Sequence, residues 1–217
     1  MAGNLEDKIK DMTNTELLDY LHSVPGHHSD YSSLYTYLVK HAPMNDYYKL
    51  LFKDFDLKHK SFLDLGPGVG WSLDVARELG ARTTFVDRDI FITKYCENKG
   101  HKGIHLDFFQ LPIKNIGRYD LILSRGSFNV DMMNRTNFPI HQLIGWMILT
   151  ARNIIVIPTW DKGELVEGED YTCVGEHFEN YLNSEVHWAF VNSGFSLRII
   201  EGINDHLRFP ITYEYTT

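Results

Sequence analysis

One stretch of the sequence, SFLDLGPGVGWSLDVARELGARTTFVDRD, constrains the fold more than any other. It begins with an apolar strand pattern, passes through three glycines at alternate positions, and continues with a helical pattern and a second, β-branched strand. Strands that alternate with helices indicate βαβ units and a parallel sheet. Open α/β sheets bind ligands at the carboxyl ends of their strands, which is where the glycines lie. The stretch therefore predicts an α/β fold with a binding site at the glycine-rich turn.

The same alternation continues to residue 158, with five strand patterns in all. Each strand is a continuous apolar run, as in a sheet that helices cover on both faces. Near the C-terminus, a helical pattern is followed by two strand patterns joined by the polar segment Asn204-Asp205-His206. Two strands with so short a connection are antiparallel neighbours. We expect a doubly wound, mostly parallel seven-stranded sheet with a C-terminal antiparallel hairpin.

The N-terminal sixty residues have a different pattern, which is helical and rich in tyrosine. The segment NTELLDYLHSV has apolar residues at helical spacing, with Asn14 or Thr15 as the expected N-cap. We therefore expect an N-terminal helical cap. The predicted organisation is one domain over residues 1–217, with the cap at 1–60, the core at 61–158, a loop insertion at 159–182, and the closing helix and hairpin at 183–217.

Composition limits the classes of function. The formal net charge is −8, which disfavours a nucleic-acid binder because such proteins carry a basic surface. No apolar run is long enough to span a membrane, and the charged N-terminus has no secretory pattern. Cys96 and Cys173 are expected to be free thiols in a reducing compartment. The adjacent His27 and His28 do not suggest a metal site. These features predict a cytoplasmic protein, monomeric or homodimeric, without a metal.

The glycine spacing limits the kinds of ligand that the turn is expected to bind. Gly66 and Gly68 fit the dinucleotide pattern G-x-G-x-x-G, but its third position holds Trp71, and the third glycine is Gly70. No Gly-Lys-Ser/Thr follows, so the turn is not a phosphate-binding P-loop. A nicotinamide cofactor is therefore disfavoured.

Together with Asp64, the turn DLGPGVG resembles the first motif of the class I S-adenosylmethionine-dependent methyltransferases, an acid followed by three alternate glycines. The resemblance extends to Asp87 at the end of the second strand and to Asp107 after the third. It implies that S-adenosylmethionine (SAM) is the cofactor and S-adenosylhomocysteine (SAH) the product. It also implies that Asp87 binds the ribose hydroxyls, that Asp107 meets the adenine amine, and that Asp64 orients the turn or meets the ligand ammonium through water. The residues expected at the cofactor are Asp64, Gly66, Gly68, Gly70, Asp87, Arg88, Asp107, Phe108 and Ser124.

Taken alone, Asp87 has a second interpretation, as the N-cap of the helix that follows, and Asp89 competes with it for that position.

The acceptor is less constrained. The loop after the fourth strand, SRGSFN, lacks the Asn/Asp-Pro-Pro-Tyr/Phe motif of amide and nucleobase methylation and the Pro-Cys pair of cytosine methylation. We expect O- or N-methylation of a small molecule. His177 is the candidate base for a hydroxyl acceptor, with a solvent-exposed loop histidine as the other interpretation. The residues expected at the acceptor are Tyr31, Tyr35, Asn129, Trp160 and Tyr171. A peptide or protein methyltransferase, an aminopropyltransferase-like enzyme and a non-catalytic interaction module remain as alternatives.

Overall fold

The structure is a computed structural model, and it describes residues 5–23, 38, 43–107, 116–129, 140–159, 185–199 and 211–216. The chain divides into two compact units, Met1–Phe108 and Phe109–Thr217. Each unit is described by itself. Their seven strands belong to a mostly parallel sheet, in the order β3-β2-β1 within the first unit and β4-β5-β7-β6 within the second. The predicted fold class is confirmed.

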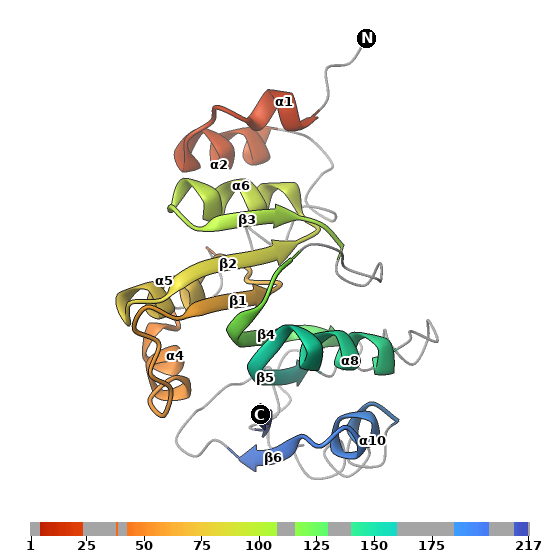
Figure 1. The fold of residues 1–217 in the computed structure, drawn as a ribbon. Coiled ribbons are helices and arrows are strands. Elements are labelled where there is room, and N and C mark those ends of the chain that lie inside the picture. Colours follow the sequence, from red (N-terminus) through yellow and green to blue (C-terminus); the bar gives the residue numbers. More distant parts are fainter. Residues whose placement is uncertain are drawn as a thin grey trace, which may run out of the picture. The chain divides into compact units, whose positions relative to one another are not determined.

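The first unit contains three parallel strands, β1 (Ser61–Leu65), β2 (Arg82–Asp87) and β3 (Lys102–His105). Helix α5 (Trp71–Glu78) joins the first two strands, and helix α6 (Ile90–Asn98) joins the second and third (Figure 1). In the strand register, Leu65 pairs with Val86 and Asp87 pairs with His105. The carboxyl ends of the three strands are thus level, and the residues that follow them share one edge of the sheet.

Local sequence explains these elements. The core of β1 and β2 is apolar on both faces, and Phe62, Leu63, Phe85 and Val86 are completely buried, whereas β3 has no fully buried residue. Each connecting helix ends before a glycine with positive φ, 91° at Gly80 and 88° at Gly100. The two strand patterns of the sequence, SFLDL and RTTFVD, coincide with β1 and β2.

Three helices of the N-terminal sixty residues are described, α1 (Leu5–Ile9), α2 (Asn14–Ser23) and α4 (Asn45–Leu51). The cap of α2 lies one residue earlier than expected, because Thr13 and Glu16 form a reciprocal capping box. The Glu16 carboxylate accepts from the Thr13 amide at 2.8 Å, and the Thr13 hydroxyl accepts from the Glu16 amide at 3.3 Å. Helix α1 is too short and too charged for its pattern to predict it.

Helix α2 packs against α6 through apolar and polar contacts. The rings of Tyr20 and Phe91 stack with centroids 6.2 Å apart. The Asn98 side-chain amide donates to the carbonyl of Met12 at 2.9 Å and to the side chain of Asn14 at the same distance. Figure 1 shows α1 and α2 beside α6. Helices α1 and α2 therefore lie on the outer side of α6, whereas α4 packs against α5.

In the second unit, β4 (Tyr119–Asn129) and β5 (Ala151–Thr159) are parallel. Strand β7 (Ile211–Thr216) runs antiparallel to β5, and β6 (Ser196–Ile199) runs antiparallel to β7. The predicted antiparallel C-terminal pair is confirmed. The helices described here are α8 (Ile140–Thr150) and α10 (Glu185–Asn192).

An aromatic cluster joins α10 to β7. The buried ring of Tyr213 stacks on Phe190 with centroids 4.7 Å apart, and its hydroxyl lies 2.5 Å from Nδ1 of His187. Phe195 packs edge-on against Phe190 at 5.1 Å. Helix α10 therefore packs on the sheet, as its sequence pattern indicates.

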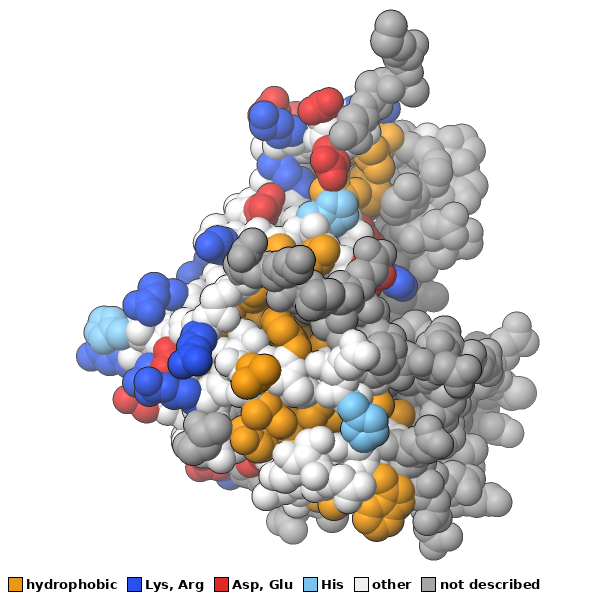
Figure 2. Space-filling view, turned by 45° about the vertical axis from the view of Figure 1, so that its right-hand side comes forward, with side chains coloured by type: hydrophobic (Ala, Val, Ile, Leu, Met, Phe, Trp, Pro, Cys, Tyr) orange, Lys and Arg blue, Asp and Glu red, His pale blue; other side chains and the backbone are white. Residues whose placement is uncertain are grey.

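Two properties of the surface bear on function. In the part of the chain that the structure describes, no helix is long and apolar enough to cross a membrane. Figure 2 shows basic and acidic side chains next to one another at the left of the face that it presents. The described part of this face thus carries charges of both signs.

Candidate functional site

The turn after β1 has the backbone conformation that its glycines predict. Gly66, Gly68 and Gly70 have φ values of 76°, 57° and 77°, a region that side chains with a Cβ rarely adopt. The Gly66 amide donates to the carbonyl of Val86 at 2.9 Å, and the Gly70 amide donates to that of Pro67 at 3.1 Å. These bonds attach the turn to β2 and close it upon itself.

Two amides of the turn remain available to a ligand. Within the described residues, the amides of Gly68 and Val69 donate no hydrogen bond. The first turn of α5 follows directly, and its N-terminus adds partial positive charge. Amides at the start of a helix form a site suited to an anionic group such as a carboxylate.

Asp64 holds the turn against this helix. Its side chain is 2% exposed, and the hydroxyl of Ser72, in the first turn of α5, donates a hydrogen bond to its Oδ2. A hydroxyl-bonded carboxylate at this depth fixes the strand end relative to the helix start. Of the two roles that the resemblance implies for Asp64, the geometry favours orientation of the turn.

Asp87 ends β2 at the same edge of the sheet, and its residue is 8% exposed. The amide of Asp89 donates to Asp87 Oδ1 at 2.8 Å. Burial, the largest cause, and the charge of the Asp89 carboxylate raise the pKa of Asp87 to about 7, against the lowering effect of the backbone amides and of the Arg88 charge. A buried carboxylate in this state gains from additional hydrogen-bond donors.

The N-cap of α6 is Asp89, not Asp87. The Asp89 carboxylate accepts from the amides of Phe91 at 2.8 Å and Ile92 at 3.4 Å. Because the capping position is filled, Asp87 is not needed for it. The second interpretation of Asp87 is thereby removed, and its carboxylate is left for another purpose.

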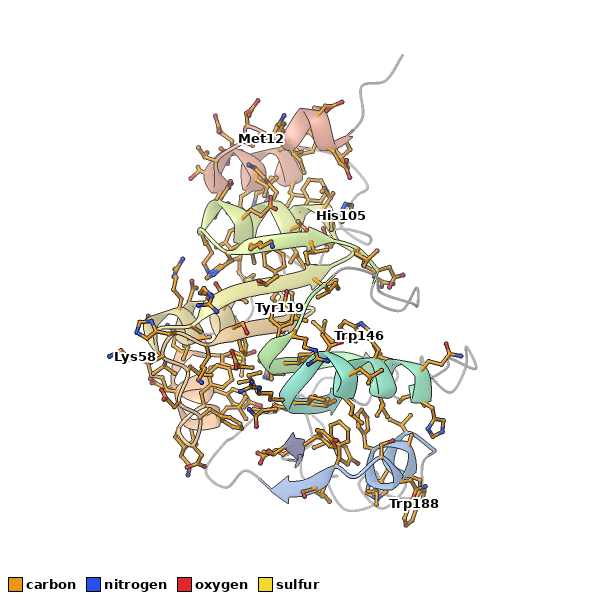
Figure 3. All side chains as sticks on the ribbon, in the orientation of Figure 1. Met12, Lys58, His105, Tyr119, Trp146 and Trp188 are labelled. Atoms are coloured by element: carbon orange, nitrogen blue, oxygen red, sulfur yellow. The ribbon has the colours of Figure 1, made fainter. Side chains whose placement is uncertain are left out.

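His105, at the end of β3, was not singled out from the sequence. Its Nε2 lies 2.9 Å from the carbonyl oxygen of Arg88, and its Nδ1 lies 3.1 Å from the Glu6 carboxylate of α1 (Figure 3). Arg88 itself is exposed, and Asp107, two residues further along the chain than His105, is half-buried. His105 therefore connects the β2–α6 turn to the N-terminal helices. No sequence spacing links it to Glu6, so no pattern reveals this contact.

Several predicted residues lie elsewhere. Ser124 is completely buried on β4 of the second unit, and only the backbone of Asn129 is described. Among the described residues, no group of histidine, cysteine, aspartate and glutamate side chains suits a metal ion. The following predicted residues fall outside the described part of the chain: His27, His28, Tyr31, Tyr35, Phe108, Trp160, Tyr171, Cys173 and His177.

The fold is shared with solved methyltransferases. Magnesium protoporphyrin IX methyltransferase from Synechocystis PCC 6803, solved with bound SAH, aligns over 97% of this chain and 96% of its own, with 14% identity and a TM-score of 0.51. The sugar N-methyltransferase KedS8 from Streptoalloteichus sp ATCC 53650 aligns over 86% of this chain and 93% of its own, with 14% identity and a TM-score of 0.59.

A putative RNA methyltransferase, PH1948 from Pyrococcus horikoshii, aligns over 81% of this chain and 86% of its own, with 16% identity and a TM-score of 0.51. No family model and no curated protein matches the sequence. The class defined by the comparisons is therefore the Rossmann-like α/β fold of SAM-dependent methyltransferases. The three proteins are named for acceptors as different as a porphyrin, a sugar and RNA, so the fold does not specify the acceptor.

Proposed function

We propose that the protein is a SAM-dependent methyltransferase that acts on a small molecule. The observation that carries the proposal is the pairing, at one sheet edge, of the Gly66–Gly70 turn with the buried Asp87 carboxylate. The first offers free amides to a carboxylate, and the second offers an acceptor to hydroxyl groups. SAM has both groups, a carboxylate on its amino-acid end and two hydroxyls on its central ribose.

The residues of this edge fit the cofactor. Asp87 would accept a hydrogen bond from each of the two ribose hydroxyls. These bidentate, charge-assisted bonds would favour the ionised form of the carboxylate. The amides of Gly68 and Val69 would receive the carboxylate of the amino-acid end. Asp107, half-buried beyond β3, would meet the adenine amine, with Arg88 and Phe108 nearby in the chain. Ser124, on β4, completes the proposed set.

The bound cofactor supplies an electrophilic methyl group on a sulfonium. The chain has to hold the acceptor in line with that group and to exclude water, and alignment alone accounts for much of the acceleration of such a transfer. An amine acceptor needs only to bind unprotonated. For a hydroxyl acceptor we propose His177 as the general base that removes its proton. Residues proposed to bind the acceptor are Tyr31, Tyr35, Asn129, Trp160 and Tyr171.

Two lines of support favour a small acceptor. The net charge of −8 disfavours the phosphate backbone of a nucleic acid. The SRGSFN segment, which belongs to β4 and is not the loop expected from the sequence, lacks the motifs of nucleobase methylation.

Calorimetry with SAH tests the proposal directly. The wild-type protein is expected to bind SAH and SAM with micromolar dissociation constants, and NADH, titrated as a control, is expected to give no heat. Absence of heat and of a thermal shift with both SAH and SAM would overturn the assignment. If the protein binds SAM, it is then screened for methyl transfer to panels of phenols, amines and sugars, with release of SAH as the signal.

A further inference from the structure

The carbonyl oxygens of the Gly66–Gly70 turn are held by side chains of helix α6. The Cys96 thiol donates to the carbonyl of Gly68 at 3.5 Å, and the Lys99 ammonium donates to that of Val69 at 2.9 Å. Cys96 lies within α6, and Lys99 is its C-cap residue. Neither side chain belongs to the strands or the turn that form the proposed site, and the sequence pattern gave no role to Lys99.

The direction of these carbonyls fixes the direction of the amides. In a trans peptide, the C=O and N–H bonds point in opposite directions. With the Gly68 oxygen facing Cys96, the amide of Val69 points away from α6. With the Val69 oxygen facing Lys99, the amide of Gly70 points to Pro67 and closes the turn. Donors on α6 thus keep the turn in the conformation that exposes an amide to a ligand.

Lys99 is held in place by a network on its other side. Its ammonium forms an ion pair with Asp74 of α5, whose carboxylate also lies 3.1 Å from Arg77 and 3.1 Å from Nε2 of His101. Burial raises the pKa of Asp74, but hydrogen bonds and charge from His101 and Lys99 outweigh it, so the pKa lies below its usual value. Asp74 therefore stays ionised near neutral pH and anchors Lys99.

The network lies directly under the turn. A Cβ atom placed on Gly70 would be 3.0 Å from the Cys96 sulfur and 3.6 Å from the Lys99 nitrogen. Lys99 thus acts on the turn through its hydrogen bond to the carbonyl of Val69.

We propose that Lys99, anchored by Asp74, is a positioning residue that sets the affinity of the turn for the amino-acid end of the cofactor. The proposal rests on the proposed function, because it takes the turn as the site of that end. It makes a prediction that a merely structural role does not: loss of Lys99 weakens binding of ligands that have an amino-acid end and spares ligands that lack it.

Two probes separate these cases. SAH has the amino-acid end, whereas 5′-methylthioadenosine has the same ribose and adenine without it. In calorimetry, Lys99→Met is expected to lower the affinity for SAH about tenfold, in line with the loss of a hydrogen bond to a charged group. The affinity for 5′-methylthioadenosine is expected to change less than about twofold. Lys99→Arg, which keeps the donor and the charge, is expected to restore most of the affinity for SAH. Lys94→Met, on the same helix, serves as the matched control and should alter neither ligand.

The outcomes are distinct. If Lys99→Met lowers the affinity for both ligands equally, or leaves the affinity for SAH unchanged, the proposed positioning role of Lys99 is overturned. A wild-type protein that binds neither ligand overturns the proposed function instead. If Lys99→Met does not fold, Asp74→Asn replaces it, since it removes the charge that anchors Lys99. We expect this variant to lower the affinity for SAH by about two- to threefold and to leave that for 5′-methylthioadenosine unchanged, because Lys99 remains but is held less firmly. The same two results would overturn the proposal.

Discussion

The two units of the protein differ in the kind of polar group that they bury. In the described residues of the first unit, two buried side chains are carboxylates, Asp64 and Asp87. In those of the second unit, the buried polar side chains are Ser124, Thr150 and His187, which are neutral or become so on burial. Burial lowers the pKa of His187, so its neutral form is favoured, and it pairs with the Tyr213 hydroxyl.

This difference separates ligand binding from packing. A buried carboxylate costs free energy unless it has hydrogen-bond partners, whereas a neutral pair inside an aromatic cluster costs little. The raised pKa of Asp87 is a direct sign of that cost. A group that is unfavourable in the empty protein and favourable with hydroxyl donors is expected at a binding site. His187 and Tyr213 already form a hydrogen bond with each other, and this bond stabilises the packing of α10 on β7.

The largest expected effect is that of Asp87→Ala on ligand binding. The loss of two charge-assisted hydrogen bonds should lower the affinity for SAH at least about 100-fold, as measured by calorimetry. The control is Asp89→Ala in the same turn. It removes the N-cap of α6 and should lower the free energy of unfolding by about 1 kcal/mol, with a much smaller effect on SAH. Equal losses of affinity in the two variants would contradict the distinct roles of these carboxylates.

The next effect concerns two glycines, one from each unit. Gly70→Ala forces a side chain to adopt φ near 77° and to approach the Cys96 sulfur, so it should destabilise the protein by about 1 to 3 kcal/mol. Gly145 lies within α8 and has nothing within 4 Å of an added Cβ. Gly145→Ala should therefore stabilise the protein by up to about 1 kcal/mol. Urea unfolding of both variants measures the two signs, and a Gly70→Ala protein as stable as the wild type would refute the argument.

A third prediction uses pH. The pKa of Asp87 rises from its usual 3.8 in the unfolded chain to about 7 in the fold. Between these values the folded protein binds more protons than the unfolded chain, so the contribution of Asp87 to stability falls as pH rises from about 4 to about 7. Arg88 and Asp89 are the charged neighbours that modulate this change. The difference in unfolding free energy between wild type and Asp87→Asn, measured across this range, should show the trend, and a constant difference would exclude it.

The smallest effect is expected from Tyr213→Phe. The variant loses the hydrogen bond to His187 and keeps the stacking on Phe190, so the free energy of unfolding should fall by about 1 kcal/mol. Affinity for SAH should stay within the error of calorimetry. A marked loss of affinity would show that the aromatic cluster of the second unit takes part in binding after all.

Sequence reasoning recovered the features that depend on neighbouring residues. The bounds of β1 and β2 follow from short apolar runs, and the helix ends follow from Gly80 and Gly100, because glycine alone adopts positive φ readily. The antiparallel β6–β7 pair follows from two strand patterns with no helix between them. Helix α1 was missed, since a five-residue charged helix has too little periodicity to recognise. The capping of α2 by Thr13 was also missed, although the spacing of Thr13 and Glu16 is that of a capping box.

By itself, then, the sequence determined the α/β fold, the glycine-rich turn and the set of acids around it. Each of these depends on backbone freedom or on hydrophobic periodicity, which are local properties. Only the tertiary structure decided that Asp89 caps α6 while Asp87 is buried, that Glu6 reaches His105, and that Lys99 and Cys96 hold the carbonyls of the turn. The roles of Asp87 and Asp89 differ through burial and side-chain orientation, whereas the other contacts join segments that are distant along the chain, at separations that no residue spacing encodes.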